Sequence, residues 1–146
     1  MSKAKALKIS KDLSAQDFQG ELIKFLNSKL QRKWIYIEIG QIYVRKSIRA
    51  LNLSVSHHKT NNYKCLDIAS INIDRLYQNQ GYFKELLLAL TEVNPYDYVY
   101  IECVYNEHLK DYLTRKGWIK SELDNCFHIE NKLLQISLLE NKLTLN

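Results

Sequence analysis

A chemically suggestive group of residues lies near the middle of the chain, in the segment YQNQGYFKELL, residues 77–87. Gly81 is one of only four glycines, and it separates an apolar run typical of a buried strand from an apolar helical pattern. Anions bind at such strand-to-helix turns in α/β sheets, because backbone N–H groups at the helix N-terminus point outward. Gly81 therefore indicates either an anion site, where a side chain would crowd a phosphate, or a tight turn alone. The spacing matches neither a P-loop nor a dinucleotide-binding fingerprint.

Two acidic residues interrupt segments that are otherwise apolar. Asp67 lies in YKCLDIASINID, residues 63–74, and Glu102 lies in YVYIECVY, residues 98–105. An unpaired charge inside such a strand is costly, so each carboxylate is expected to have either an ion-pair partner or a function. The four histidines do not converge in the sequence, and we expect no metal site.

The segment INIDRLYQNQGYFKELL, residues 71–87, resembles the acyl-CoA-binding motif of the GCN5-related N-acetyltransferases (GNAT). In that family the pattern Gln/Arg-x-x-Gly-x-Gly/Ala follows a strand and opens a helix. Gln78 and Gly81 fill its first two positions, whereas Phe83 stands where the family usually has a small residue. The resemblance implies that the backbone amides of this turn hold the CoA pyrophosphate, which assigns to the cofactor Gln78, Asn79, Gln80, Gly81, Tyr82 and Phe83.

A second family signature, Asn-x-x-Ala-x-x-Leu-Tyr-x-Lys-x-Gly-Phe after a strand, is similar to NEHLKDYLTRKGW, residues 106–118. By this resemblance Asn106 binds the pantetheine arm, a role compatible with its being a helix cap. The tyrosine that often protonates the leaving thiolate in the family corresponds to Leu113. Tyr112 lies one residue earlier, about 100° round the helix, and is either the general acid or a packed aromatic side chain.

The resemblance also implies a function, direct transfer of an acetyl group from acetyl-CoA to an amine of a small molecule or protein. Such a transfer needs a placed neutral amine, a backbone N–H donor for the oxyanion and a base. The resemblance implies that the strands before and after the helix form this site, so we expect the amides of Ile71 and Ile73 to contact the acyl-CoA. Glu102 and Asp67 are the candidates for the base. The alternative is a catalytically silent protein of the same fold that binds a macromolecular partner. Nucleic-acid binding is a third hypothesis, supported only by the net charge of +5.

The hydrophobic patterns predict an α/β fold with a mixed sheet, and the resemblance adds that the central sheet is splayed and flanked by helices. A helix capped by Ser14 is expected over residues 14–32, and a β-hairpin follows. A strand, a helix and a second strand then form a right-handed unit whose two strands are parallel. The ranges of the expected strands before the last helix are 34–39, 41–48, 50–56, 63–74 and 98–105.

The end of the chain is expected to hold one more helix and then strands. Asn106 and Gly117 bound a helical pattern. The strands predicted after it are 126–130, 133–139 and 142–146. An edge strand among the last 20 residues would be able to pair with a second chain, which allows a homodimer.

Length and composition set the remaining expectations. The 146 residues, 46% hydrophobic and 25% charged, are typical of a single folded domain covering 1–146. The longest apolar stretches are shorter than the roughly 20 residues that cross a bilayer, and the basic N-terminus lacks the features of a secretory signal. We therefore expect a cytoplasmic protein without a membrane partner. The three cysteines lack paired spacing and are expected to be buried thiols.

Overall fold

The computed structural model describes residues 7–51, 61–102, 104–121 and 125–144. The elements in chain order are α1 (Lys11–Leu26), β1 (Arg32–Ile37), β2 (Gly40–Leu51), β3 (Asn61–Ile73), the 3-10 helix η1 (Arg75–Tyr77), α2 (Tyr82–Val93), β4 (Tyr98–Ile101), α3 (Glu107–Arg115), β5 (Ile119–Lys120), β6 (Phe127–Glu130) and α4 (Asn131–Thr144). None of the described helices is long and apolar enough to cross a membrane.

The six strands form one mixed sheet in the order β1-β2-β3-β4-β6-β5. β3 and β4 are parallel, as the strand–helix–strand pattern predicts, and the other neighbours are antiparallel. β4 pairs only with Cys65–Ile68, although β3 continues to Ile73. A bulge in the β2–β3 register leaves Ala69 unmatched just after the last paired residue. The two central strands therefore part at this point, which confirms the expected splayed α/β architecture.

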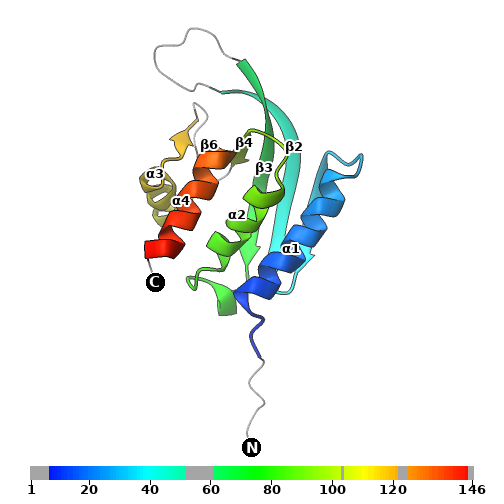
Figure 1. Cartoon of the computed structure of the whole chain (residues 1–146), viewed down its shortest axis with the longest axis vertical. Coiled ribbons are helices and arrows are strands. Elements are labelled where there is room, and N and C mark those ends of the chain that lie inside the picture. The colour runs from blue at the N-terminus through cyan, green and yellow to red at the C-terminus, as the bar shows by residue number, and fades with distance from the viewer. Residues whose placement is uncertain (1–6, 52–60, 103, 122–124, 145–146) are drawn as a thin grey trace, which may run out of the picture.

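Three helices cover one face of the sheet. Figure 1 shows α1, α2 and α4 in a row, with α2 between the other two. Alternation along the strands sends every second side chain into the layer between sheet and helices, and each fully buried leucine there contributes about 1.5–3 kcal/mol. The buried residues of this layer include Phe18, Leu22, Phe25, Val44, Leu66, Ile68, Leu86, Leu87, Leu90, Val99 and Ile129.

The first helix differs from the prediction at both ends. Its N-cap is Ser10, whose Oγ accepts a hydrogen bond of 3.1 Å from the Leu13 N–H, so the prediction of Ser14 as the cap is wrong. Ser14 lies within the helix and is buried. The helix ends at Leu26, six residues before the predicted end, and Leu30 beyond it is half exposed.

The last 20 residues contain the largest error of the sequence analysis. The strands predicted over 133–139 and 142–146 are wrong, because Asn131–Thr144 form α4, and residues 145–146 lie outside the described part of the chain. Leu134 and Leu138, four residues apart, bury the inner side of this helix in the core. The predicted edge strand, and with it that route to a homodimer, is absent from the described residues.

Two other strands have different lengths from those predicted. β2 runs on to Leu51, so the strand expected over 50–56 begins as its continuation, and the rest of it lies outside the described residues. β4 stops at Ile101, before Glu102. Residues 57–62 lie between two of the expected strands; within this range only residues 61 and 62 are described, and they belong to β3.

Candidate functional site

The turn that carries Gly81 lies just beyond the point where β3 and β4 part. Gly81 is the N-cap of α2 and has φ +87°, in the left-handed region that costs other residues about 1–2 kcal/mol. The caps of α1 and α3 each accept a hydrogen bond through their side chains, from Leu13 and Leu109, whereas Gly81 provides none. The first backbone N–H groups of α2 therefore have no side-chain cap and are available to an anion.

The side chains of the two glutamines in this turn hold the turn itself. Gln78 Nε2 donates a 2.7 Å hydrogen bond to the carbonyl of Ile73, and Gln80 Nε2 donates one of 2.8 Å to the carbonyl of Leu76. Both contacts fix the path from β3 through η1 into α2. These two side chains thus shape the turn, and we expect Gln78 and Gln80 to contact an anion through their backbone N–H groups.

A cavity of about 310 Å³ opens between this turn and α3. It brings together seven of the predicted site residues: Ile73, Asn79, Gly81, Tyr82, Phe83, Asn106 and Tyr112. Phe83 is partly buried against the core and also forms part of the cavity wall. Ile71, Gln78 and Gln80 are not among the lining residues.

The second half of the cavity wall comes from α3. Asn106 Oδ1 accepts a hydrogen bond of 3.2 Å from the Leu109 N–H, which confirms Asn106 as the cap of this helix. Tyr112 packs against the core, and its buried hydroxyl has no hydrogen-bond partner in the described part of the chain. Burial raises the pKa of Tyr112, so its phenol is protonated at neutral pH. Leu113, which stands at the position of the family tyrosine, is fully buried and has no polar group.

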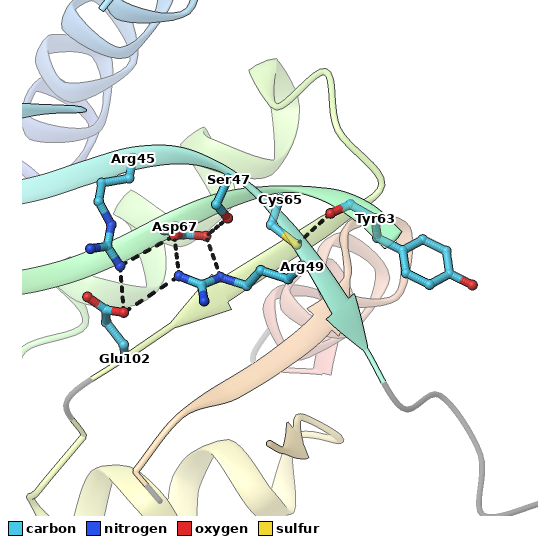
Figure 2. A network of polar contacts seen from close by, with 7 residues as sticks. All are labelled: Arg45, Ser47, Arg49, Tyr63, Cys65, Asp67 and Glu102. Carbon is cyan, nitrogen blue, oxygen red and sulfur yellow. Dashed lines mark hydrogen bonds and ion pairs between the residues drawn. The ribbon is translucent and has the colours of Figure 1, made fainter. Parts of the chain in front are cut away.

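Asp67 is held in a polar network on the sheet face opposite the row of helices (Figure 2). Its side chain is fully buried, and three side chains of β2 surround it. Ser47 Oγ donates a hydrogen bond of 2.6 Å, Arg49 Nη2 lies 2.7 Å from Oδ2, and Arg45 Nη2 lies 3.5 Å from Oδ2. The carboxylate therefore has the ion-pair partners that its place in an apolar strand requires.

Glu102, the residue directly after β4, completes this network. Its carboxylate lies 2.5 Å from Arg45 and 3.6 Å from Arg49, and 21% of its side chain is exposed. The Arg49 guanidinium also stacks 3.8 Å from the centre of the Tyr100 ring. Burial alone would lower the pKa of Arg49, but the hydrogen bond and charge of Asp67 raise it above its ordinary value.

The network lies where the strands separate. Asp67 and its neighbour Ile68 are the last β3 residues paired with β4, and the Glu102 N–H donates a 3.2 Å hydrogen bond to the Ile68 carbonyl. Neither carboxylate lines the 310 Å³ cavity. The two predicted bases thus lie together where β3 and β4 begin to separate. We call the space between the strands beyond this point the gap, and Ile73, at the far end of β3, lines the cavity.

The sequence analysis missed several residues that belong to these contacts. Arg45, Ser47 and Arg49 alternate along β2, and their period-2 spacing opposite an isolated acid was the signal that could have identified them. Lys11 was missed because its position beside Gly81 depends on how α1 packs against α2. No local pattern in the sequence could have shown that proximity.

The histidines and cysteines differ in their surroundings. No described group of three histidine, cysteine or acidic side chains is arranged to hold a metal ion. His57 and His58 lie outside the described residues, while His108 lines the cavity and His128 is buried. Cys65 and Cys126 are buried free thiols, as predicted, and Cys103 is outside the described residues.

Comparison with known proteins identifies the architecture. No protein-family model and no curated protein sequence matches the chain. Among solved structures, a mutant of KacT is 17% identical, with a TM-score of 0.54 over 89% of this chain and 96% of KacT. A mutant AtaT toxin, bound to the C-terminus of the antitoxin AtaR and acetyl-CoA, is 18% identical, with a TM-score of 0.51 over 67% of this chain. AtaT complexed with acetyl-methionyl-tRNAfMet is 19% identical, with a TM-score of 0.50 over 70% of this chain.

The extent of these matches limits them to the fold. The chain spans 62% and 66% of the two AtaT chains, and every identity is below 25%. AtaT and KacT are toxins with the GNAT fold. The mixed sheet, its parting central strands and the glycine turn before α2 agree with that likeness. The chain therefore has the acyl-CoA N-acyltransferase fold of the GCN5-related N-acetyltransferases, as its sequence motifs predict.

Proposed function

We propose that this protein is an N-acetyltransferase that transfers the acetyl group of acetyl-CoA to an amine. The observation that carries the proposal is the arrangement around the 310 Å³ cavity, which joins the left-handed Gly81 turn to Asn106 and Tyr112. The uncapped first turn of α2 suits the pyrophosphate, and the cavity between this turn and α3 suits the pantetheine arm. The acetyl-CoA bound in the AtaT structure supports the same use of this fold.

The reaction requires four events at the gap between β3 and β4. The amine nitrogen attacks the thioester carbonyl, the C–S bond breaks, the amine loses one proton, and the CoA thiolate gains one. Beyond Ile68 the strand that pairs with β3 among the described residues is β2, so alternate backbone N–H groups of β3 face the gap. The amides of Ile71 and Ile73 are the proposed donors to the carbonyl oxygen.

Two side chains are proposed to move the protons. Tyr112 is the candidate donor to the thiolate, because its phenol is protonated and has no described hydrogen-bond partner. Glu102 is the candidate acceptor from the amine, because its carboxylate is partly exposed at the start of the gap. Asp67 is fully buried, accepts hydrogen bonds from Ser47 and Arg49 and is ion-paired with Arg45, so we assign it to holding the two arginines.

The acceptor is proposed to be an amine on a small molecule, a protein or a nucleic acid. AtaT complexed with acetyl-methionyl-tRNAfMet supports a macromolecular acceptor. The second candidate function, a silent protein of the same fold that binds a macromolecular partner, is favoured by the fully buried Leu113 at the usual tyrosine position.

The cofactor site is tested by titrating acetyl-CoA into the wild type and a matched pair of variants by calorimetry. Gly81→Ala and Gly117→Ala each place a Cβ on left-handed backbone, at φ +87° and +89°, so each costs about 1–2 kcal/mol of stability. Only Gly81→Ala is expected to weaken the binding of acetyl-CoA, since Gly117 does not line the cavity. No binding to the wild type at millimolar ligand would refute the proposal.

Catalysis is tested separately from binding. The wild type is incubated with acetyl-CoA and a panel of amines, lysine-bearing proteins and aminoacyl-tRNA, and products are identified by mass. Tyr112→Phe is expected to lower kcat while leaving stability unchanged, because the lost hydroxyl has no described partner. Acetyl-CoA binding without any acetylated product would favour the silent protein.

A further inference from the structure

The short segment that leads into α1 is bonded to the Gly81 turn. Tyr82 Oη donates a hydrogen bond of 2.7 Å to the Ile9 carbonyl, and the Ile9 N–H donates one of 3.4 Å to Tyr77 Oη. Lys8 Nζ donates a hydrogen bond of 3.1 Å to Gln80 Oε1. These contacts join parts of the chain that lie 68 to 73 residues apart in sequence, and Figure 1 shows the start of α1 beside the start of α2.

This arrangement places the charge of Lys11 directly at the turn. Lys11 Nζ lies 3.3 Å from the position that a Cβ on Gly81 would occupy, and 5.9 Å from the centre of the Tyr82 ring. Lys11 is also the first residue of α1. Its ammonium group therefore lies near the N-termini of two helices, where the helix dipoles disfavour a cation.

The described part of the chain provides no ion pair for this charge. No described carboxylate lies within 4.0 Å of Lys11 Nζ. A second cation of the first turn of α2, Lys84, lines the cavity. The Lys11 ammonium beside the uncapped backbone N–H groups, with Lys84 in the cavity wall, is complementary to a multiply charged anion.

We propose that Lys11, which lies beside the Gly81 turn and outside the lining of the cavity, binds the pyrophosphate of acetyl-CoA where this group meets the turn. This inference rests on the proposed function and adds a ligand contact that neither sequence motif contains. It assigns to the start of α1 a role in cofactor affinity, besides its packing against α2. The hydrogen bond from Tyr82 to Ile9 positions the segment.

The test compares Lys11→Gln with Lys24→Gln, a change of the same kind at the other end of the same helix. Lys24 is 73% exposed and its described ion pair is with Glu21, so it controls for the loss of one surface charge. Each protein is titrated with acetyl-CoA and with 3′-dephospho-acetyl-CoA, which retains the pyrophosphate. Lys11→Gln is expected to lower the affinity for both ligands by about tenfold, which is the effect of losing one charge-assisted hydrogen bond. Lys24→Gln is expected to leave both affinities unchanged. Lys11→Arg is expected to restore most of the affinity.

Each alternative outcome is distinct. Equal affinities of Lys11→Gln and Lys24→Gln would overturn the inference, and so would a loss confined to the ligand that has the 3′-phosphate. Tyr82→Phe, which keeps the ring and loosens the segment, is expected to weaken both ligands by a smaller factor. Failure of the wild type to bind acetyl-CoA would count against the proposed function, whereas normal binding with an insensitive Lys11→Gln would reject only the role of Lys11.

Discussion

Asp67→Asn should be among the most destabilising single changes in the sheet. The four groups of the network balance at present, two arginines against two carboxylates, and the substitution leaves a net charge of +1 beside the start of the gap. Removing one partner of a buried ion pair costs about 3–5 kcal/mol. Arg45 and Arg49 are 30% and 23% exposed, so water screens part of this cost, and we expect a loss of about 3 kcal/mol. For a chain of this length that corresponds to a fall in Tm of about 6–12 °C.

The matched control is Glu102→Gln, which removes the same charge from the same two arginines. Its carboxylate is partly exposed, and both arginines keep Asp67, so we expect a loss of about 1 kcal/mol. Urea unfolding of both variants and the wild type gives the comparison, provided that the m-values agree. Losses of equal size in the two variants, or a loss below about 1 kcal/mol for Asp67→Asn, would refute the argument that burial of Asp67 dominates the network.

Two further predictions concern buried titratable groups. Burial lowers the pKa of His128, so the unfolded chain takes up this proton first as the pH falls below about 6.5. The free energy of unfolding should therefore decrease between pH 7 and 5. The urea midpoint of His128→Phe should fall less steeply with pH than that of the wild type, and equal slopes for the two proteins would contradict this assignment. Burial, with the charge of Asp67, raises the pKa of Cys65 to about 12. A thiol reagent at pH 8 should consequently label Cys65 only in denaturant, as measured by peptide mass mapping, and rapid native labelling would show that the thiol is accessible.

The central strand–helix–strand unit could be predicted because its signals are local. β4 is a continuous apolar run and β3 is rich in apolar residues, which is typical of strands covered on both faces, and Pro95 follows the helix between them. The right-handed crossover then fixes the parallel pairing. The early end of β4 was not predictable in this way, since the sequence returns to apolar residues after Glu102 while the strands part.

The C-terminal helix was mistaken for strands because its exposed face is also apolar. Leu133, Ile136 and Leu139 are 56%, 52% and 43% exposed, while Leu134 and Leu138 are buried. Apolar residues on both sides of a helix obscure the 3.6-residue period from which an amphipathic helix is recognised. Packing of Leu134 and Leu138 against the core favours the helix, and the sequence pattern alone does not show this packing.

The candidate site divides in the same way between local and distant signals. Gly81 and Asn106 act through the backbone conformation or cap of their own helix, so motifs of a few residues locate them. The partners of Asp67 and the position of Lys11 come from other elements, and only the packed structure brings them together. The sequence can identify single residues such as Asp67 as unusual, but it does not show which residues of other elements contact them.

The network at the start of the gap also explains why two acids are present where one base would suffice. β3 and β4 share no ladder beyond Ile68, so the side chains that bridge β2, β3 and the end of β4 must fix the spacing of the strands there. A single carboxylate shared by Arg45 and Arg49 would have to leave them in order to accept a proton from an amine. Asp67 is buried and stays with both arginines, so Glu102 can exchange partners while each arginine keeps one carboxylate contact. We infer that Asp67 preserves the shape of the gap so that Glu102 is free to take part in the reaction.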